Sequence, residues 1–279
     1  MTRRMNGRWT RMLAAGACTT AAVLLAACGG ETESGTPVPE SATAATQMDA
    51  AETDAPGSKQ THSQPSAGVS EKPEVSAPYR AEEILVSGST DTVDYDVVIP
   101  QISGGDPAVV TEFNESMRAA LEDWIQRSDD MSYTLSTQEH EVTRIGEHVV
   151  AGLLVASYNA NPPGAHPTPL VATVVVNTDT AAPITLQDLF PDLQAGLNRL
   201  SEQAALLLPG TAAGPEYFAD GIAPETANFA NWLPTPAGME IHFDDYQVGP
   251  HAVGLVTITV PWENLTDVMD PYMATVVAS

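Results

Sequence analysis

Residues 92–124, TVDYDVVIPQISGGDPAVVTEFNESMRAALEDW, decide the fold class, because they place a strand directly before an amphipathic helix. The β-branched run from Thr92 to Pro100 is typical of a strand. Asp106 followed by Pro107 favours a helix start, since aspartate caps the first backbone N–H groups and proline fits the first helical turn. Apolar residues then recur every three or four positions, which predicts a helix packed on a core. These residues are Val110, Phe113, Met117, Leu121 and Trp124.

Further strands and a second helix are predicted downstream of this segment. Thr185 and Asp188 fit a capping box that opens a short helical turn. A second amphipathic helix is predicted from Leu193 to Leu207, before the helix-stopping pair that follows it at Pro209. We predict an α+β fold with antiparallel sheets and two main amphipathic helices, because short turns join most strands. The later strands are predicted at residues 131–142, 147–158, 170–177, 228–233, 239–243 and 253–260.

The N-terminal segment is predicted to be a lipoprotein signal peptide covering residues 1–27. Four arginines without an acidic residue precede an apolar stretch from Met12 to Ala27, which is too short to span a bilayer comfortably. This stretch ends in Leu25-Ala26-Ala27-Cys28, which matches the bacterial lipobox. We therefore expect Cys28 to be lipidated and to anchor the mature chain on the outer face of a membrane. A buried cysteine at the end of a core helix is the structural alternative.

Residues 28–78 are predicted to be a tether that follows the lipidated cysteine. The segment is rich in Pro, Ala, Ser and Thr and holds no Leu, Ile, Phe, Tyr or Trp, so it cannot bury enough apolar surface to fold. Almost all aromatic residues follow it, which places one globular domain at residues 79–279, with possible halves at 79–183 and 184–279. Cys18 leaves with the signal peptide, so the mature chain has no free thiol, disulfide or zinc–thiolate site.

The charge of the domain excludes a general nucleic-acid binder. Residues 79–279 hold 28 acidic residues against five arginines and no lysine, whereas binding to phosphate requires a basic surface. The acidic excess favours one of two interpretations. It steers a cationic partner toward the domain, or it is a solvated acidic surface suited to a salt-rich habitat.

Two segments resemble the PdaC/RsiV-like superfamily. The first is the stretch from Tyr158 through the Gly164-Ala165-His166-Pro167 loop and the following strand to Ile184-Thr185-Leu186-Gln187-Asp188-Leu189-Phe190. The second is the aromatic-rich run from Asn228 to Trp262, with Ile241-His242-Phe243 at its centre. Together the two segments cover most of residues 85–270. The resemblance implies an RsiV-like α+β domain.

The known relatives of this superfamily point to binding functions at the cell envelope. They include anti-sigma factors whose outer domain binds lysozyme, peptidoglycan deacetylases that carry this module as an extension, and secreted or lipid-anchored actinobacterial proteins. We expect the chain to lack both the cytoplasmic segment of the first group and the metal-dependent domain of the second, and therefore to resemble the third. The resemblance assigns no lysozyme-contacting residue to this sequence.

His166 and Tyr246 are the candidate ligand-binding residues. His166 lies in a proline-rich loop, where a histidine faces a ligand or acts in acid–base chemistry, or else ties the turn to backbone carbonyls. Tyr246 follows Asp244-Asp245 in a predicted hairpin turn, so we expect its ring to be partly exposed. An Asp pair in such a turn is commonly solvated.

No catalytic residue, metal ligand or cofactor is predicted. The remaining histidines in the domain, at positions 140, 148, 242 and 251, lack the spacing of a metal site. There is no Gly-x-Ser-x-Gly motif and no phosphate-binding glycine loop. The sequence therefore favours a binding module over an enzyme.

Three functions remain open at this point. The first is capture of a cationic protein such as a lysozyme, with salt-sensitive binding. The second is binding of peptidoglycan or another glycan, and the third is an enzyme of unknown class. In each case the chain meets the membrane through Cys28 and does not bind nucleic acid.

Overall fold

The computed structural model describes residues 78–127 and 131–279 of the 279-residue chain. The predicted signal peptide (1–27), the lipidation site Cys28 and the predicted tether up to residue 77 lie outside the described residues. Within the described ranges, no helix has both the length and the apolar character needed to cross a bilayer.

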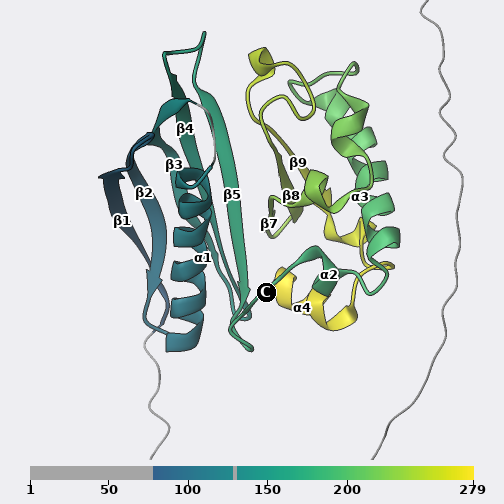
Figure 1. Ribbon diagram of the computed structural model, residues 1–279. Coiled ribbons are helices and arrows are strands. Elements are labelled where there is room, and N and C mark those ends of the chain that lie inside the picture. The colour runs from purple at the N-terminus through teal and green to yellow at the C-terminus, as the bar shows by residue number, and fades with distance from the viewer. Residues whose placement is uncertain (1–77, 128–130) are drawn as a thin grey trace, which may run out of the picture. The chain divides into compact units, whose positions relative to one another are not determined.

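The first half of the described chain forms a six-stranded sheet whose strands follow one another in sequence order (Figure 1). Neighbouring strands are antiparallel except β2 and β3, which are parallel. The strands are β1 (Arg80–Ser89), β2 (Val93–Ser103), β3 (Ser132–Ile145), β4 (Val149–Asn161), β5 (Thr168–Asn177) and β6 (Ala182–Pro183).

Helix α1 (Pro107–Ile125) makes the parallel pair possible, because it returns the chain along the sheet between β2 and β3 (Figure 1). Its start is the predicted one: the Asp106 side chain accepts a hydrogen bond from the Ala108 N–H at 2.7 Å. Three of the predicted apolar residues, Phe113, Met117 and Leu121, are buried. In the first turn the buried residue is Val109, whereas the predicted Val110 is only half-buried.

Strand β4 is apolar from Val149 to Ala156, because both faces of the sheet are covered there. Val150 and Leu154 belong to the hydrophobic cluster under α1. Ala151 and Leu153 belong to a second cluster on the opposite face, formed with the C-terminal half of the chain. Strand β4 therefore lies between the two clusters and contributes side chains to both.

The C-terminal half of the described chain adds a three-stranded antiparallel sheet and helix α3 (Leu193–Leu207). This sheet lies against the first one at β5, where the Trp232 N–H donates to Oγ1 of Thr173 at 3.1 Å. Side chains of α3 and of both sheets fill the second hydrophobic cluster. The strands are β7 (Trp232–Pro234), β8 (Gly238–Phe243) and β9 (Val256–Pro261).

Short helices connect and close this half of the chain. Helix α4 (Pro271–Ala278) brings Ser279 to the β3–β4 turn, where the His148 N–H donates to Oγ of Ser279 at 3.0 Å. The Arg144 guanidinium contacts the main-chain oxygen of the same residue. The other short helices are α2 (Leu186–Leu189) and 3-10 turns at Leu208–Gly210, Ala219–Ile222, Thr226–Phe229, His251–Val253 and Trp262–Asn264.

The predicted α+β class, with antiparallel sheets and two main amphipathic helices, is confirmed. The predicted strand 228–233 is wrong in its first part, because a 3-10 turn occupies Thr226–Phe229 and pairing begins only at Trp232. Strand β1, helix α4 and the parallel β2–β3 pair are absent from the sequence prediction.

Candidate binding site

Three segments meet at one end of the six-stranded sheet (Figure 1). They are the end of α1, the loop between β4 and β5, and the loop between β8 and β9. Val93 pairs with Tyr133, and Tyr133 pairs in turn with Ala160. Strands β2 and β3 therefore begin, and β4 ends, at this same end of the sheet. Residues far apart in the sequence are thereby brought to one place.

A cluster of three aromatic rings joins the two loops. The imidazoles of His166 and His251 stack with their centroids 3.4 Å apart and their planes within 7°. The Tyr246 ring lies on His251 with a centroid distance of 5.7 Å and an interplanar angle of 30°. His251 therefore contacts both of the residues that the sequence selects, and we call the three residues the ring cluster.

A buried carboxylate holds the ring cluster in place. Oδ2 of Asp245 lies 2.8 Å from Nδ1 of His251. Only 2% of the Asp245 side chain is exposed, against 27% for His251. Oδ1 of Asp245 is also buried, and it has no hydrogen-bond partner among residues 78–127 and 131–279. Such an oxygen is costly to leave unpaired, so it can accept a hydrogen bond from a ligand.

The turn that carries Asp245 is fixed by a neighbouring glutamine. The Gln247 N–H donates to the carbonyl of Asp244 at 3.0 Å, and the Asp244 N–H donates to the Gln247 side chain at 2.9 Å. The Gln247 amide also donates to the carbonyls of Gly221 and Asn228, at 2.8 and 2.9 Å. The turn is therefore bound to the 3-10 segments behind it.

This turn places Tyr246 in an unfavourable backbone conformation. Its φ of 63° lies in the left-handed region, which a bulky side chain rarely adopts. Tyr246 is 54% exposed, and the sequence predicts partial exposure. A strained, exposed aromatic residue held by its surroundings is typical of a binding surface.

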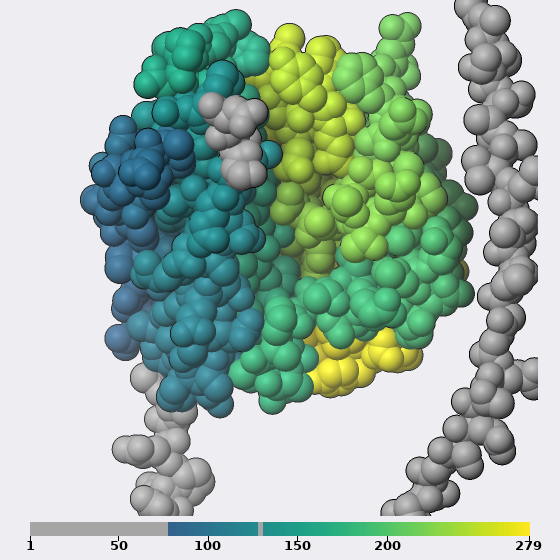
Figure 2. All heavy atoms as spheres, viewed as in Figure 1, coloured from purple at the N-terminus to yellow at the C-terminus, as the bar shows by residue number. Residues whose placement is uncertain are grey.

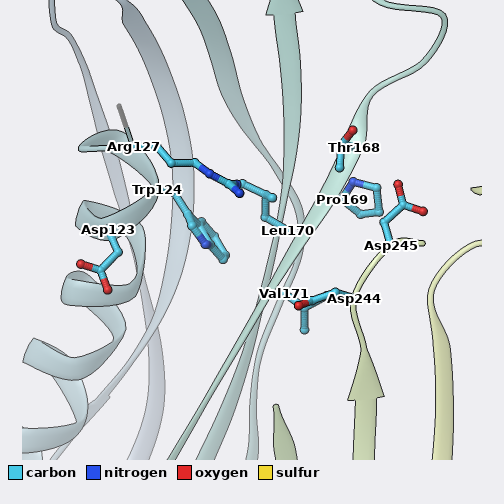
Figure 3. Close-up of a pocket in the computed structure, with 9 residues that line it drawn as sticks. All are labelled: Asp123, Trp124, Arg127, Thr168, Pro169, Leu170, Val171, Asp244 and Asp245. Atoms are coloured by element: carbon cyan, nitrogen blue, oxygen red, sulfur yellow. The ribbon is translucent and has the colours of Figure 1, made fainter. Parts of the chain in front are cut away.

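A pocket of about 440 Å³ adjoins the ring cluster, since Asp245, which contacts His251, also lines the pocket. Figure 3 shows Trp124 and Arg127 reaching from the end of α1 toward β5, with Asp244 and Asp245 on the other side. The Trp124 side chain is half-buried and Arg127 is exposed. The lining residues are Asp123, Trp124, Arg127, Thr168, Pro169, Leu170, Val171, Asp244 and Asp245.

The charges in the pocket are of both signs. Burial raises the pKa of the Asp244 carboxyl above its usual value, and the positive charge of Arg127 partly opposes this. Asp244 also accepts a hydrogen bond from the Asn231 amide at 3.3 Å. A cationic or hydroxyl-bearing group in this pocket would meet carboxylate oxygens on one side and the Trp124 indole on the other, which suits hydrogen bonding and cation–π contact.

Of the residues selected from the sequence, His166 and Tyr246 both lie at this site. Nδ1 of His166 is also 3.3 Å from the carbonyl oxygen of Pro167, which is the contact expected for a histidine that ties its own turn. Sequence reasoning misses His251 and Trp124. The six-residue interval between Asp245 and His251 has no recognised motif, and Trp124 follows the helical period of the core residues.

The other histidines of the domain each lie near at least one carboxylate, and His148 lies near two, Asp179 and Glu147. His140 lies 2.8 Å from Glu83, and His242 lies 2.9 Å from Glu240, which lowers the pKa of that glutamate. His148 pairs with Asp179. In the part of the chain that the structure describes, no three His, Cys, Asp or Glu side chains are grouped so as to hold a metal ion.

The fold and this site define an α+β domain with a mixed-charge pocket at the end of its larger sheet. Residues 187–263 match the family described as "Protein of unknown function (DUF3298)". The matched segment includes the turn at Asp244 and Asp245, Tyr246 and His251, but not His166.

Two solved structures of that family are similar to this chain. A DUF3298 family protein from Pseudomonas aeruginosa PAO1 is 16% identical with a TM-score of 0.44, and the match covers 72% of this chain and 96% of that one. A family member from Bacteroides fragilis is 16% identical with a TM-score of 0.43, over 71% and 97% of the two chains. No curated protein matches this chain.

Proposed function

We propose that residues 79–279 form a binding module and not a catalytic domain, and that the ring cluster and its pocket capture a cationic protein of the lysozyme type. The observation that carries this proposal is that Asp244, Asp245 and Trp124 line one pocket, and that Asp245 also contacts His251 of the ring cluster. Carboxylates next to aromatic faces suit the lysine and arginine side chains of a partner. The RsiV-like resemblance supports a lysozyme as that partner.

The charge of the domain supports the same partner. Only five arginines accompany 28 acidic residues in residues 79–279. One of them, Arg199, is already held by Asp267 through two hydrogen bonds of 2.7 and 2.9 Å. A surface with so little free positive charge attracts a cationic protein at long range, and this attraction weakens as salt is added.

Binding of a peptidoglycan fragment is the second candidate. The pocket of about 440 Å³ has room for a small ligand, and the half-buried Trp124 offers an aromatic face to a sugar ring. Asp245 and Arg127 would supply an acceptor and donors for its polar groups. Binding of this kind depends on shape and hydrogen bonds, so it should persist in high salt.

We propose further that Cys28 anchors the chain on the outer face of a membrane. The support is the lipobox Leu25-Ala26-Ala27-Cys28 behind a basic segment. Metabolic labelling with an alkyne-tagged fatty acid tests this. Cys28→Ser should lose the label and leave the membrane fraction. A chain that stays labelled without Cys28 would contradict the proposal.

The binding proposal is tested with the soluble chain of residues 29–279. Lysozyme, an unrelated cationic protein of similar charge and solubilised peptidoglycan fragments are titrated at low and at physiological salt. Lysozyme binding that persists at physiological salt, when the other cationic protein no longer binds, is the expected result. Equal binding of both cationic proteins, at low salt only, would overturn it, and salt-resistant retention of the glycan alone would favour the second candidate.

One matched pair of variants tests the site itself. Asp245→Asn removes the buried charge with almost no change in shape, and we expect it to weaken lysozyme binding about tenfold or more. Glu115→Gln removes the same charge from an exposed position on α1, outside the pocket, and should have little effect. If the two variants bind equally well, the pocket is not the binding site.

A further inference from the structure

The outer edge of strand β5 is only partly paired. Strand β6 covers it at Val176 and Asn177, so the rest of this edge has no partner strand in the part of the chain that the structure describes. Helix α1 lies on one side of the edge and the C-terminal half of the chain on the other (Figure 1). Figure 2 shows the surface hollowed between these two walls. The edge of β5 therefore lies at the bottom of a groove.

Alternate residues of β5 direct their main-chain groups toward β4 and outward, because the register with β4 has no bulge. The Val175 carbonyl accepts a hydrogen bond from the Ile184 N–H at 2.8 Å, which lies on the outer side. Thr173 and Val171 lie two and four residues before Val175, so their N–H and C=O groups point outward as well. Pro169, which has no N–H, is next in the same series. The open edge thus offers the donors and acceptors of Thr173 and Val171 to an added strand.

Two pockets follow one another along this edge. The first is the pocket of about 440 Å³ beside the ring cluster, which is lined by residues 168–171 of β5. The second, of about 380 Å³, is lined by residues 173–175 and has mainly apolar walls, which include Ile184, Leu186 and Trp232. Helix α1 contributes side chains to both pockets. One chain lying along the groove would therefore enter both.

The distance between the pockets matches four residues of an extended chain. Leu170 lines the first pocket and Val174 the second, and four residues of a strand span about 13 Å. On α1, Trp124 lines the first pocket and Ser116 the second, and eight residues of a helix span about 12 Å. In a strand, side chains four positions apart point to the same face. Two side chains of one added strand can therefore fill the two pockets.

The groups that line the two pockets select different side chains. The first pocket sets the carboxylates of Asp123, Asp244 and Asp245 against the guanidinium of Arg127, and it also has the Trp124 indole. It therefore suits a lysine or arginine side chain. No charged residue of the described ranges lines the second pocket, so it suits leucine or another apolar side chain.

We propose that this groove binds an extended segment of a cationic protein, which joins β5 as an added antiparallel strand. The proposal rests on the proposed function, because it uses the same first pocket and the same kind of partner. Antiparallel pairing is the more stable arrangement per residue. Since β5 runs from the first pocket to the second, the segment carries an apolar residue in the second pocket and, four positions later, a lysine or arginine in the first. The walls on both sides leave room for one strand and keep the edge of another folded sheet away.

A pair of synthetic peptides tests the direction and the spacing. The sequence Thr-Leu-Thr-Val-Thr-Lys-Thr places its leucine opposite Val174 and its lysine opposite Leu170. With a dye on the peptide, fluorescence anisotropy follows its binding to the chain of residues 29–279 at physiological salt. We expect it to bind at least about tenfold more tightly than the peptide in which leucine and lysine are exchanged, which has the same composition. Equal affinities, or no binding of the first peptide up to about 1 mM, would overturn the proposal.

Main-chain pairing is tested separately from the side chains. N-methylation of the third and fifth residues of the first peptide blocks the two amides that face Thr173 and Val171, and should weaken binding at least about tenfold. Methylation of the fourth and sixth residues, whose amides point away from β5, should have little effect. In hydrogen exchange, the peptide should protect the amides of Thr173 and Val171 but not that of Ala172, which already faces β4. Equal effects of the two methylations would overturn strand addition.

A matched pair of variants separates this proposal from the proposed function. Ala230→Trp narrows the second pocket, which Ala230 lines, and should weaken binding of both the first peptide and lysozyme at least about tenfold. Ala227→Trp changes an exposed residue of the neighbouring 3-10 turn, outside the pocket, and should bind like the wild type. Selective lysozyme binding that Ala230→Trp leaves unchanged would overturn strand addition and leave the proposed function intact. Peptide binding in the expected order without selective lysozyme binding would uphold the groove and overturn lysozyme as the partner.

Discussion

The imidazole of His166 lies against that of His251, with the ring centroids 3.4 Å apart. The first residue belongs to the loop between two strands of the larger sheet, and the second to a loop of the smaller sheet. This contact therefore joins the two halves of the domain at the candidate binding site, and it allows the role of each loop to be tested separately.

His166→Ala should change binding more than stability. A stacked, exposed pair of rings contributes about 1 kcal/mol, which corresponds to a fall in melting temperature of about 2–4 °C for a domain of this size. We expect a fall within that range together with weaker binding of lysozyme. His140→Ala, which alters a histidine away from the site, should leave binding unchanged. A fall of about 10 °C or more would make His166 a structural residue.

Tyr246→Gly should separate strain from function. The left-handed conformation costs a tyrosine about 1–2 kcal/mol and glycine almost nothing, although glycine also makes the unfolded chain more flexible. The free energy of unfolding in urea should therefore stay the same or rise by up to about 1 kcal/mol, while binding weakens. Tyr246→Phe keeps the ring and should retain most of the binding. A large loss of stability in the glycine variant would contradict this account of the turn.

The pair of His148 and Asp179 should contribute most to stability in mildly acidic solution. Its 3.0 Å hydrogen bond raises the pKa of the His148 imidazole and lowers the pKa of the Asp179 carboxyl, to which the Tyr272 hydroxyl also donates. The contribution of His148 to stability is fully present below the pKa that it has in the unfolded chain. This contribution is lost as the pH rises through its higher pKa in the folded protein. The contribution of Asp179 to stability is fully present above the pKa that it has in the unfolded chain. This contribution is lost as the pH falls through its lower pKa in the folded protein.

Their combined contribution is therefore largest between about pH 4 and pH 6.5. A double-mutant cycle with His148→Gln and Asp179→Asn, followed by thermal unfolding from pH 4 to pH 9, measures it. The coupling should be small, because both groups are exposed, and should decrease as the pH rises through the folded pKa of His148. A coupling that grows toward pH 9 would show that another interaction is responsible.

Gly196→Ala should destabilise the second hydrophobic cluster. A Cβ atom at this position would lie 2.2 Å from Cγ of Phe190, a ring that is fully buried. Overpacking of this kind costs about 1–3 kcal/mol. Gly210→Ala is the matched control, since a Cβ there meets no atom within 4 Å. Equal unfolding free energies for the two variants would mean that the Phe190 ring can move aside.

Local signals in the sequence account for α1 and α3 but not for every element. The Asp–Pro pair that marks the start of α1 also precedes α4, at Asp270 and Pro271, where an apolar and β-branched segment hides the helix. Strand β1 lacks an alternating pattern, because both of its faces are largely exposed and pairing with β2 alone makes it a strand. The parallel β2–β3 pair depends on the path of α1, which no local pattern specifies.

The binding site is predictable only in pieces for a similar reason. His166 and Tyr246 stand out because each lies in a turn-rich segment with few apolar neighbours. His251 becomes notable only when the fold brings it between them and onto Asp245. Trp124 keeps the period of the buried face of α1, so the sequence gives no sign that it also lines a pocket.

Strand β1 enters the domain at the end of the sheet opposite the binding site. Arg80 pairs with Ser103, whereas the site lies at the edge where Val93 pairs with Tyr133. If the chain is anchored at Cys28, a pulling force between the membrane and a captured partner would act along β1. The hydrogen bonds to β2 lie perpendicular to that direction. They would resist the force together in shear instead of opening one after another, so the domain would hold its partner under mechanical load.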